Sequence, residues 1–255
     1  MSKPTYYTFG MSVWAAAGEL AIADLEYPAD AIDVKVVNLA EGANFTPEFL
    51  AINPNGTLPT LVADGKAYTS TKQVIKYLIE HAPRKAAKGT ALRDTLQEAQ
   101  LDPNAPMLLA RNDEQLKALA SGFPLIFLQN RQDSLEKHSA LPAAADFQEF
   151  YTGKKAVNGG LLAVFKGAAP DAAKAGTITA FIMTELPTLL PESGFLGGET
   201  PGEDDYHLGA WLARIAMFTG GSVADGGPVP PKVEAYWKAW AARPAFQKVY
   251  EKGLH

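Results

Sequence analysis

The sequence contains no cysteine. Disulfide bonds, thiolate metal ligands and mechanisms that use a protein thiol as the nucleophile are therefore excluded. Any thiol chemistry must use a thiol that the ligand brings. The histidines lack the spacing to one another or to carboxylates that is typical of a metal site, so we predict no metal; they are His81, His138, His207 and His255.

Long apolar runs and basic clusters are also missing. No stretch approaches about 18 uninterrupted apolar residues, and the N-terminus lacks the pattern of a signal peptide, so we expect a cytoplasmic protein without a membrane partner. The 23 Lys and Arg against 28 Asp and Glu give a net charge of −5, which argues against a nucleic-acid partner. The phosphate-loop, dinucleotide, esterase and zinc-protease motifs are absent.

The composition is that of a folded protein, with 47% hydrophobic and 20% charged residues in 255 positions. The first 81 residues alternate strand-like and helix-like patterns, which predicts an α/β unit with a mixed sheet. The expected elements are a strand at Pro4–Phe9, a helix at Ser12–Leu25, a strand at Ala31–Leu39, a short helix from Pro47, strands at Thr57–Val62 and Lys66–Tyr68, and a helix at Thr71–His81.

The rest of the chain reads as helices joined by loops. The polar, breaker-containing segment Ala82–Gly89 is typical of a linker, so we place a domain boundary near residue 84. The expected helices are Thr90–Leu101, a helix following Asn112, Phe123–Leu135, Ala143–Phe150, Ala172–Leu190, Asp205–Phe218 and Pro231–Ala241.

Three stretches together resemble the glutathione transferase family: Asn53–Pro59, Gly197–Asp205 and Ala242–Gln247. The resemblance implies a thioredoxin-like N-terminal domain with a mixed four-stranded sheet at residues 1–84 and an all-helical domain at residues 85–255. It also implies glutathione as co-substrate, a small hydrophobic electrophile, a two-fold homodimer and a structural capping role for Asp205. The region Ser121–Asp171 is longer than the family pattern, which favours an insertion that reshapes the substrate site or the dimer contact.

A glutathione enzyme must lower the pKa of a thiol from about 8.5, and one hydrogen bond plus a helix N-terminus can supply this shift. By resemblance, Ser12 lies at the catalytic position of serine-type transferases. The structural alternative is that Ser12 only caps its helix. Tyr6 and Tyr7 are rival catalytic residues, because other branches of the family use a tyrosine in the first strand.

The resemblance also implies contacts with the rest of glutathione. Pro59 matches a cis-proline that presents the backbone of Leu58 to the cysteinyl amide. Thr71 occupies the position that meets the γ-glutamyl carboxylate, and Ser70 replaces the family's acid, which weakens the contact to the ammonium group. Asn44 falls where the family contacts the glycyl carboxylate.

We therefore predict a transferase that conjugates the glutathione thiolate to hydrophobic electrophiles. Two alternatives use the same thiolate for ether cleavage or for peroxide reduction. A third is a non-catalytic member that binds a ligand or a protein partner, which the serine at position 70 favours.

Overall fold

The computed structural model describes residues 3–108, 112–165, 177–219, 221, 223 and 229–255. Its first part is a four-stranded mixed sheet in the order β2-β1-β3-β4, with β2 parallel to β1, and β3 antiparallel to both β1 and β4. The strands are β1 (Thr5–Thr8), β2 (Asp33–Val36), β3 (Thr60–Ala63) and β4 (Lys66–Tyr68), and the helices are α1 (Val13–Asp24), α2 (Pro47–Ile52) and α3 (Thr71–His81). This confirms the predicted fold of the N-terminal part.

Side chains alternate between the two faces of the sheet along β1, so neighbouring residues of this strand pack against helices on opposite faces. Tyr6 lies in the core that contains α1 and α3, whereas the next residue, Tyr7, packs against Phe49 of α2. Each of these helices begins at a hydroxyl that accepts a backbone N–H: Ser12 for α1, Thr46 for α2 and Ser70 for α3. Such caps satisfy donors that the helix leaves free.

The second part is helical, as predicted, but with different boundaries. Its elements are α4 (Leu92–Thr95), η3 (Ala99–Leu101), α5 (Ala105–Leu108), α6 (Asp113–Ala120), α7 (Phe123–Ser139), η4 (Pro142–Phe147), α8 (Gln148–Phe165), η5 (Phe181–Glu185), α10 (Leu186–Leu189), α11 (Glu203–Phe218), α12 (Pro231–Ala241) and α13 (Pro244–Val249). The helix predicted at Thr90–Leu101 is wrong in extent, because only short turns form there. The prediction for Ala143–Phe150 missed α8, which continues to Phe165, while residues 172–176 of another predicted helix lie outside the described residues.

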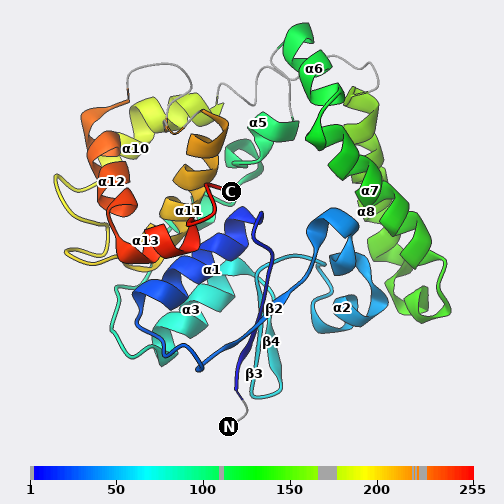
Figure 1. Ribbon diagram of the computed structural model, residues 1–255, viewed down its shortest axis with the longest axis horizontal. Coiled ribbons are helices and arrows are strands. Elements are labelled where there is room, and N and C mark those ends of the chain that lie inside the picture. The colour runs from blue at the N-terminus through cyan, green and yellow to red at the C-terminus, as the bar shows by residue number, and fades with distance from the viewer. Residues whose placement is uncertain (1–2, 109–111, 166–176, 220, 222, 224–228) are drawn as a thin grey trace.

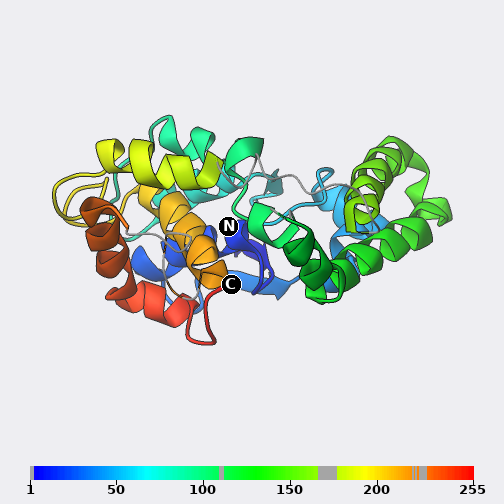
Figure 2. The same cartoon turned by 90° about the horizontal axis from the view of Figure 1, so that it is seen from above.

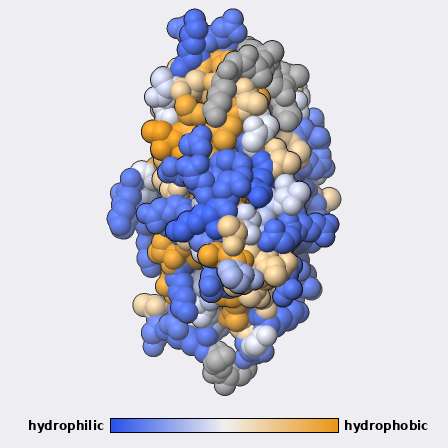
Figure 3. Space-filling model, turned by 90° about the vertical axis from the view of Figure 1, so that its right-hand side faces the viewer, coloured by the Kyte–Doolittle hydropathy of each residue, from blue (hydrophilic) through white to orange (hydrophobic). Residues whose placement is uncertain are grey.

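These helices form two separate groups around the sheet (Figure 1). Helix α11 packs along α1, and α13 contacts α1 as well. Helix α7 packs against α8 and against the segments η1 (Leu39–Glu41) and η2 (Ala43–Phe45). Leu50 of α2 lies in the same buried cluster as Leu135 of α7 and Tyr151 of α8. Figure 2 shows α7 and α8 standing apart from the group that holds α11. The outer face of the α7–α8 pair is largely hydrophilic, with scattered hydrophobic residues (Figure 3).

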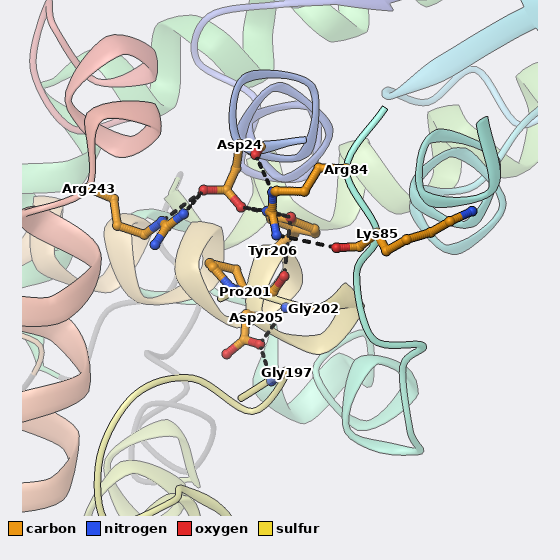
Figure 4. Close-up of polar contacts among 9 residues, drawn as sticks. All are labelled: Asp24, Arg84, Lys85, Gly197, Pro201, Gly202, Asp205, Tyr206 and Arg243. Carbon is orange, nitrogen blue, oxygen red and sulfur yellow. Dashed lines mark hydrogen bonds and ion pairs between the residues drawn. The ribbon is translucent and has the colours of Figure 1, made fainter. Parts of the chain in front are cut away.

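A buried carboxylate at the end of α1 joins the two parts of the chain (Figure 4). The side chain of Asp24 is 2% exposed and forms ion pairs with Arg84 of the linker and Arg243 at the start of α13. The hydroxyl of Tyr206 on α11 donates to the same carboxylate at 2.9 Å. A buried charge is tolerated only when it is paired and hydrogen-bonded, and Asp24 meets both conditions.

The start of α11 is a second buried acidic anchor. The carboxylate of Asp205 accepts N–H groups of Leu196, Gly197 and Gly202, each at 2.8 Å, and the hydroxyl of Tyr236 at 2.7 Å. Burial raises the pKa of Asp205, while these hydrogen bonds act in the opposite direction. The structural capping role expected for Asp205 is therefore confirmed.

His207 gives the fold a pH dependence that we expect to be measurable. The side chain is fully buried beside Trp14, and burial lowers its pKa to about 3. The unfolded chain therefore binds a proton that the folded chain excludes. Stability contributed by neutral His207 is complete above pH 6.5 and falls by about 1.4 kcal/mol per unit as the pH drops toward 3.

We predict that His207→Phe flattens this dependence. Between pH 6.5 and 5 the free energy of unfolding of the wild type should fall by about 2 kcal/mol more than that of the variant. Urea denaturation at several pH values measures both slopes. Parallel slopes for the two proteins would contradict the assignment.

Candidate functional site

A cavity of about 330 Å³ lies between the N-terminal part and the two helical groups. It is bounded by the start of α1, the segments around Asn44 and Leu58, helices α7 and α8, and the end of α11. The polar and charged side chains of its lining include Ser12, Asn44, Arg131, Lys154 and Arg214, and Leu58 lines it as well. The cavity volume is within the range that suits a small organic ligand.

Ser12 lines this cavity at the N-terminus of α1. Its backbone N–H donates to Phe9 at 2.8 Å, and its hydroxyl oxygen accepts the N–H of Ala15 at 3.3 Å. The cap uses the oxygen as an acceptor, so the hydroxyl hydrogen remains available as a donor. Ser12 therefore caps α1, and this cap is compatible with a hydrogen bond from Ser12 to an anion in the cavity.

Neither tyrosine of β1 is among the described residues that line the cavity. Tyr6 is fully buried, donates to the carbonyl of Ala15 at 2.6 Å, and has a pKa well above its usual range because of burial. Tyr7 packs against Phe49, with the Lys35 ammonium over its ring at 5.8 Å. Both side chains serve packing, which leaves Ser12 as the one of these three hydroxyl residues that lines the cavity.

The Asn53–Pro59 segment brings Leu58 to the cavity wall. Asn53 is fully buried, and its amide donates to the Thr57 carbonyl at 2.9 Å and to the Thr60 hydroxyl at 2.7 Å. Gly56 adopts a φ of +59°, and a Cβ there would lie 2.7 Å from the ring of Phe150 on α8, so only glycine fits. The segment is thus fixed both locally and by the helical part.

Of the other residues predicted to contact glutathione, some line the cavity and some are not among its described lining residues. Asn44 lines the cavity, but its amide donates to the Gly56 carbonyl at 2.6 Å, so it also fixes the loop before Leu58. The Leu58–Pro59 peptide bond is cis, as the resemblance predicts. Ser70 caps α3 and Thr71 is buried, and neither is among the described lining residues.

One wall of the cavity is positively charged, which was not predicted from the sequence. Three cations, Arg131, Lys154 and Arg214, line the cavity against one carboxylate, Asp102, although the whole chain has a net charge of −5. Arg214 is 2% exposed, donates to the carbonyl of Met11, and its Nε has no hydrogen-bond partner. Burial lowers the pKa of Arg214.

Of the three cations, only Arg214 could have been noticed in the sequence, because it lies within a strongly apolar helical segment, where a charged residue is unusual. Arg131 and Lys154 lie on helices that the sequence analysis either shortened or missed. Among the described residues, no group of three or more His, Asp or Glu could hold a metal ion. No described helix is long and apolar enough to cross a membrane.

Comparisons with known proteins define the class. A family profile described as "Glutathione S-transferase, N-terminal domain" matches residues 7–86. The chain is 28% identical to glutathione S-transferase 3 of Zea mays over 224 residues, 85% of this chain and 80% of that protein. It is 30% identical to glutathione S-transferase 1 of Dianthus caryophyllus, with a match that spans 54% of this chain and 58% of that protein's length.

The solved structures agree on the fold. The crystal structure of a β-etherase from Sphingobium sp. strain SYK-6 superposes with a TM-score of 0.65 at 16% identity, covering 99% of this chain and 100% of that one. A thioredoxin-like sheet with a cis-proline beside the cavity, joined to a helical part, defines the class of fold. Residues 7–86 thus match the N-terminal domain of the glutathione transferase family, and the chain as a whole is similar to glutathione transferases.

Asn44 offers a test of how the cavity wall is held. Asn44→Ala removes a buried hydrogen bond to the Gly56 carbonyl, so we expect the free energy of unfolding to fall by about 1–3 kcal/mol. Chemical denaturation measures the loss. The matched control is Asn55→Ala, because Asn55 is exposed in the same loop. Equal stability of the two variants would contradict a structural role for Asn44.

Proposed function

We propose that this protein is a glutathione transferase of the serine type that conjugates glutathione to small electrophiles. The observation that carries the proposal is Ser12, a capping hydroxyl that faces a cavity whose wall also contains Leu58, next to the cis bond to Pro59. In this reaction the glutathione sulfur forms a bond to the electrophile, the leaving group departs with the electron pair, and the thiol proton passes to solvent.

Three features of the chain support thiolate formation at this place. The Ser12 hydroxyl is free to donate, and the N-terminus of α1 adds the favourable potential of free N–H groups. Arg214 fixes the carbonyl of Met11, the residue before Ser12, and places a buried positive charge beside the same cavity. Each stabilises an anion more than the neutral thiol, which lowers the thiol pKa.

Leu58, Pro59, Ser70, Thr71 and Asn44 are proposed to hold the rest of glutathione. The backbone of Leu58 would meet the cysteinyl amide, and Thr71 with the N-terminus of α3 would meet the γ-glutamyl carboxylate. Ser70 carries no charge to pair with the ligand's ammonium group, so we expect affinity to depend on the backbone donors. A homodimer in the cytoplasm remains the expected state of the enzyme.

Ether cleavage is a second reaction within reach of the same thiolate. An aryl ether would lose an aryloxide to the attacking sulfur, whereas a conjugation substrate would lose another leaving group or accept an addition. The cavity geometry is shared by both reactions, so the panel of test substrates should contain a halogenated aromatic electrophile and an aryl ether. Release of a phenol from the ether would extend the proposal to cleavage.

Binding of glutathione is tested by thermal unfolding. At a concentration one hundred times the dissociation constant, glutathione should stabilise the protein by about 2.7 kcal/mol. At this chain length each kcal/mol raises the melting temperature by about 2–4 °C, so we expect a rise of several degrees. No rise at any concentration up to saturating levels would contradict the proposal and favour a member that binds another ligand.

The role of Ser12 is tested by steady-state kinetics. We expect Ser12→Ala to lower kcat/KM by about 10- to 100-fold, because it removes one hydrogen bond to a charged group. Ser12→Thr retains both the cap and the donor and should keep much of the activity. Assays run well below the melting temperature of each variant separate this loss from the cost of losing the cap, about 1 kcal/mol. Full activity in Ser12→Ala would contradict the proposed role of the Ser12 hydroxyl in stabilising the thiolate.

A further inference from the structure

Two cations of the cavity wall have no counter-ion in the part of the chain that the structure describes. Arg131 of α7 and Lys154 of α8 both line the cavity, and neither forms an ion pair with a described carboxylate. The Arg131 guanidinium lies over the ring of Phe45 at 4.8 Å and that of Phe127 at 5.3 Å. The Lys154 ammonium lies over the ring of Phe150 at 5.5 Å.

The surroundings of Arg131 and Lys154 make it unfavourable to hold these two cations without a counter-ion. Burial lowers the pKa of Arg131 to about 10, and burial together with the positive charge of Arg131 lowers the pKa of Lys154. Two like charges that repel each other in a half-buried site are unfavourable, and aromatic faces compensate only in part. A bound carboxylate would remove this repulsion and could accept paired N–H donors from the guanidinium.

Lys155, the neighbour of Lys154 in α8, is a surface lysine that has an ion-pair partner. Lys155 is absent from the cavity lining, and its ammonium lies 3.4 Å from the Glu136 carboxylate and 3.3 Å from the Ser139 hydroxyl. Glu136 of α7 therefore pairs with Lys155 and not with Lys154. Arg131 and Lys154 line the cavity without an ion-pair partner among the described residues.

The surroundings of the two cations indicate what kind of molecule carries the anion. The same two helices contribute an apolar surface to the cavity, formed by Phe123, Phe127, Leu128, Val157 and Leu161. A ligand with one anionic group and an apolar body would satisfy both the charges and this surface. Glutathione is polar along its whole length, so it matches the cations but not the apolar wall.

We propose that Arg131 and Lys154 form a carboxylate-binding site for the second substrate, and that this substrate is an aromatic or aliphatic acid. The acid group lies between α7 and α8, and the apolar body lies along the wall toward Ser12. The role of this site in catalysis rests on the proposed transferase function, whereas binding of the acid at the site does not depend on that function. Glutathione also carries carboxylates, so the test must distinguish the two sources.

Isothermal titration calorimetry with phenylbutyrate and with the matched alcohol phenylbutanol measures the contribution of the charge. We expect the wild type to bind the acid about tenfold or more tightly than the alcohol. Arg131→Gln and Lys154→Gln should each lose about tenfold in affinity for the acid and leave the alcohol unchanged. Lys155→Gln is the matched control and should bind both probes as the wild type does.

A parallel titration with glutathione separates the sources of the carboxylate. Unchanged glutathione affinity in Arg131→Gln, together with weakened binding of the acid, supports the assignment to the second substrate. Weakened glutathione with unchanged acid would overturn it, as would equal affinity of the wild type for acid and alcohol. If the acid binds as expected and glutathione does not bind at all, the anion site stands and the transferase function fails.

Discussion

The buried carboxylate of Asp24 holds the two parts of the chain in one arrangement. It receives Arg84 from the linker, Tyr206 from α11 and Arg243 from the start of α13, so four distant segments meet at the C-terminal end of α1. At the other end of α1, Arg214 of α11 donates to Met11. Helix α11 therefore runs antiparallel to α1 and is attached to it at both ends, which fixes where Ser12 faces the cavity.

The cavity combines two chemical environments because two groups of helices contribute to it. The α1 and α11 side supplies a hydroxyl, a helix N-terminus and a buried guanidinium, which together suit an anionic sulfur. The α7 and α8 side supplies an apolar wall with two cations that have no ion-pair partner among the described residues. A positive cavity in an acidic protein also attracts anionic ligands selectively, since the net charge of −5 repels them elsewhere.

Local signals in the sequence were sufficient for most of the N-terminal part. The helix predicted from Pro47 forms because Thr46 caps it and Pro47 takes its first position, and the strands predicted at Thr57–Val62 and Lys66–Tyr68 are joined by an Asp64-Gly65 turn. Both features depend on backbone chemistry within a few residues. The cis bond at Pro59 came from the resemblance alone, since most bonds before proline are trans.

The helical part was harder to predict because tertiary packing overrides local preference. Three glycines, Gly153, Gly159 and Gly160, lie within α8, and each costs about 1 kcal/mol relative to alanine in a helix. Packing against α7 compensates, with Asn158 donating to the carbonyl of Leu128 at 2.9 Å. The cation cluster was missed for the same reason, since only the folded chain brings those side chains to one cavity.

The central claim is that this cavity stabilises the thiolate of bound glutathione through Ser12. Ultraviolet absorbance of the thiolate, followed against pH in the binary complex, measures the pKa of the bound thiol directly. The account predicts a pKa at least about one unit below the free value near 8.5 in the wild type, and a return most of the way to that value in Ser12→Ala. An unshifted pKa in the wild type, or the same lowered pKa in both proteins, would contradict it.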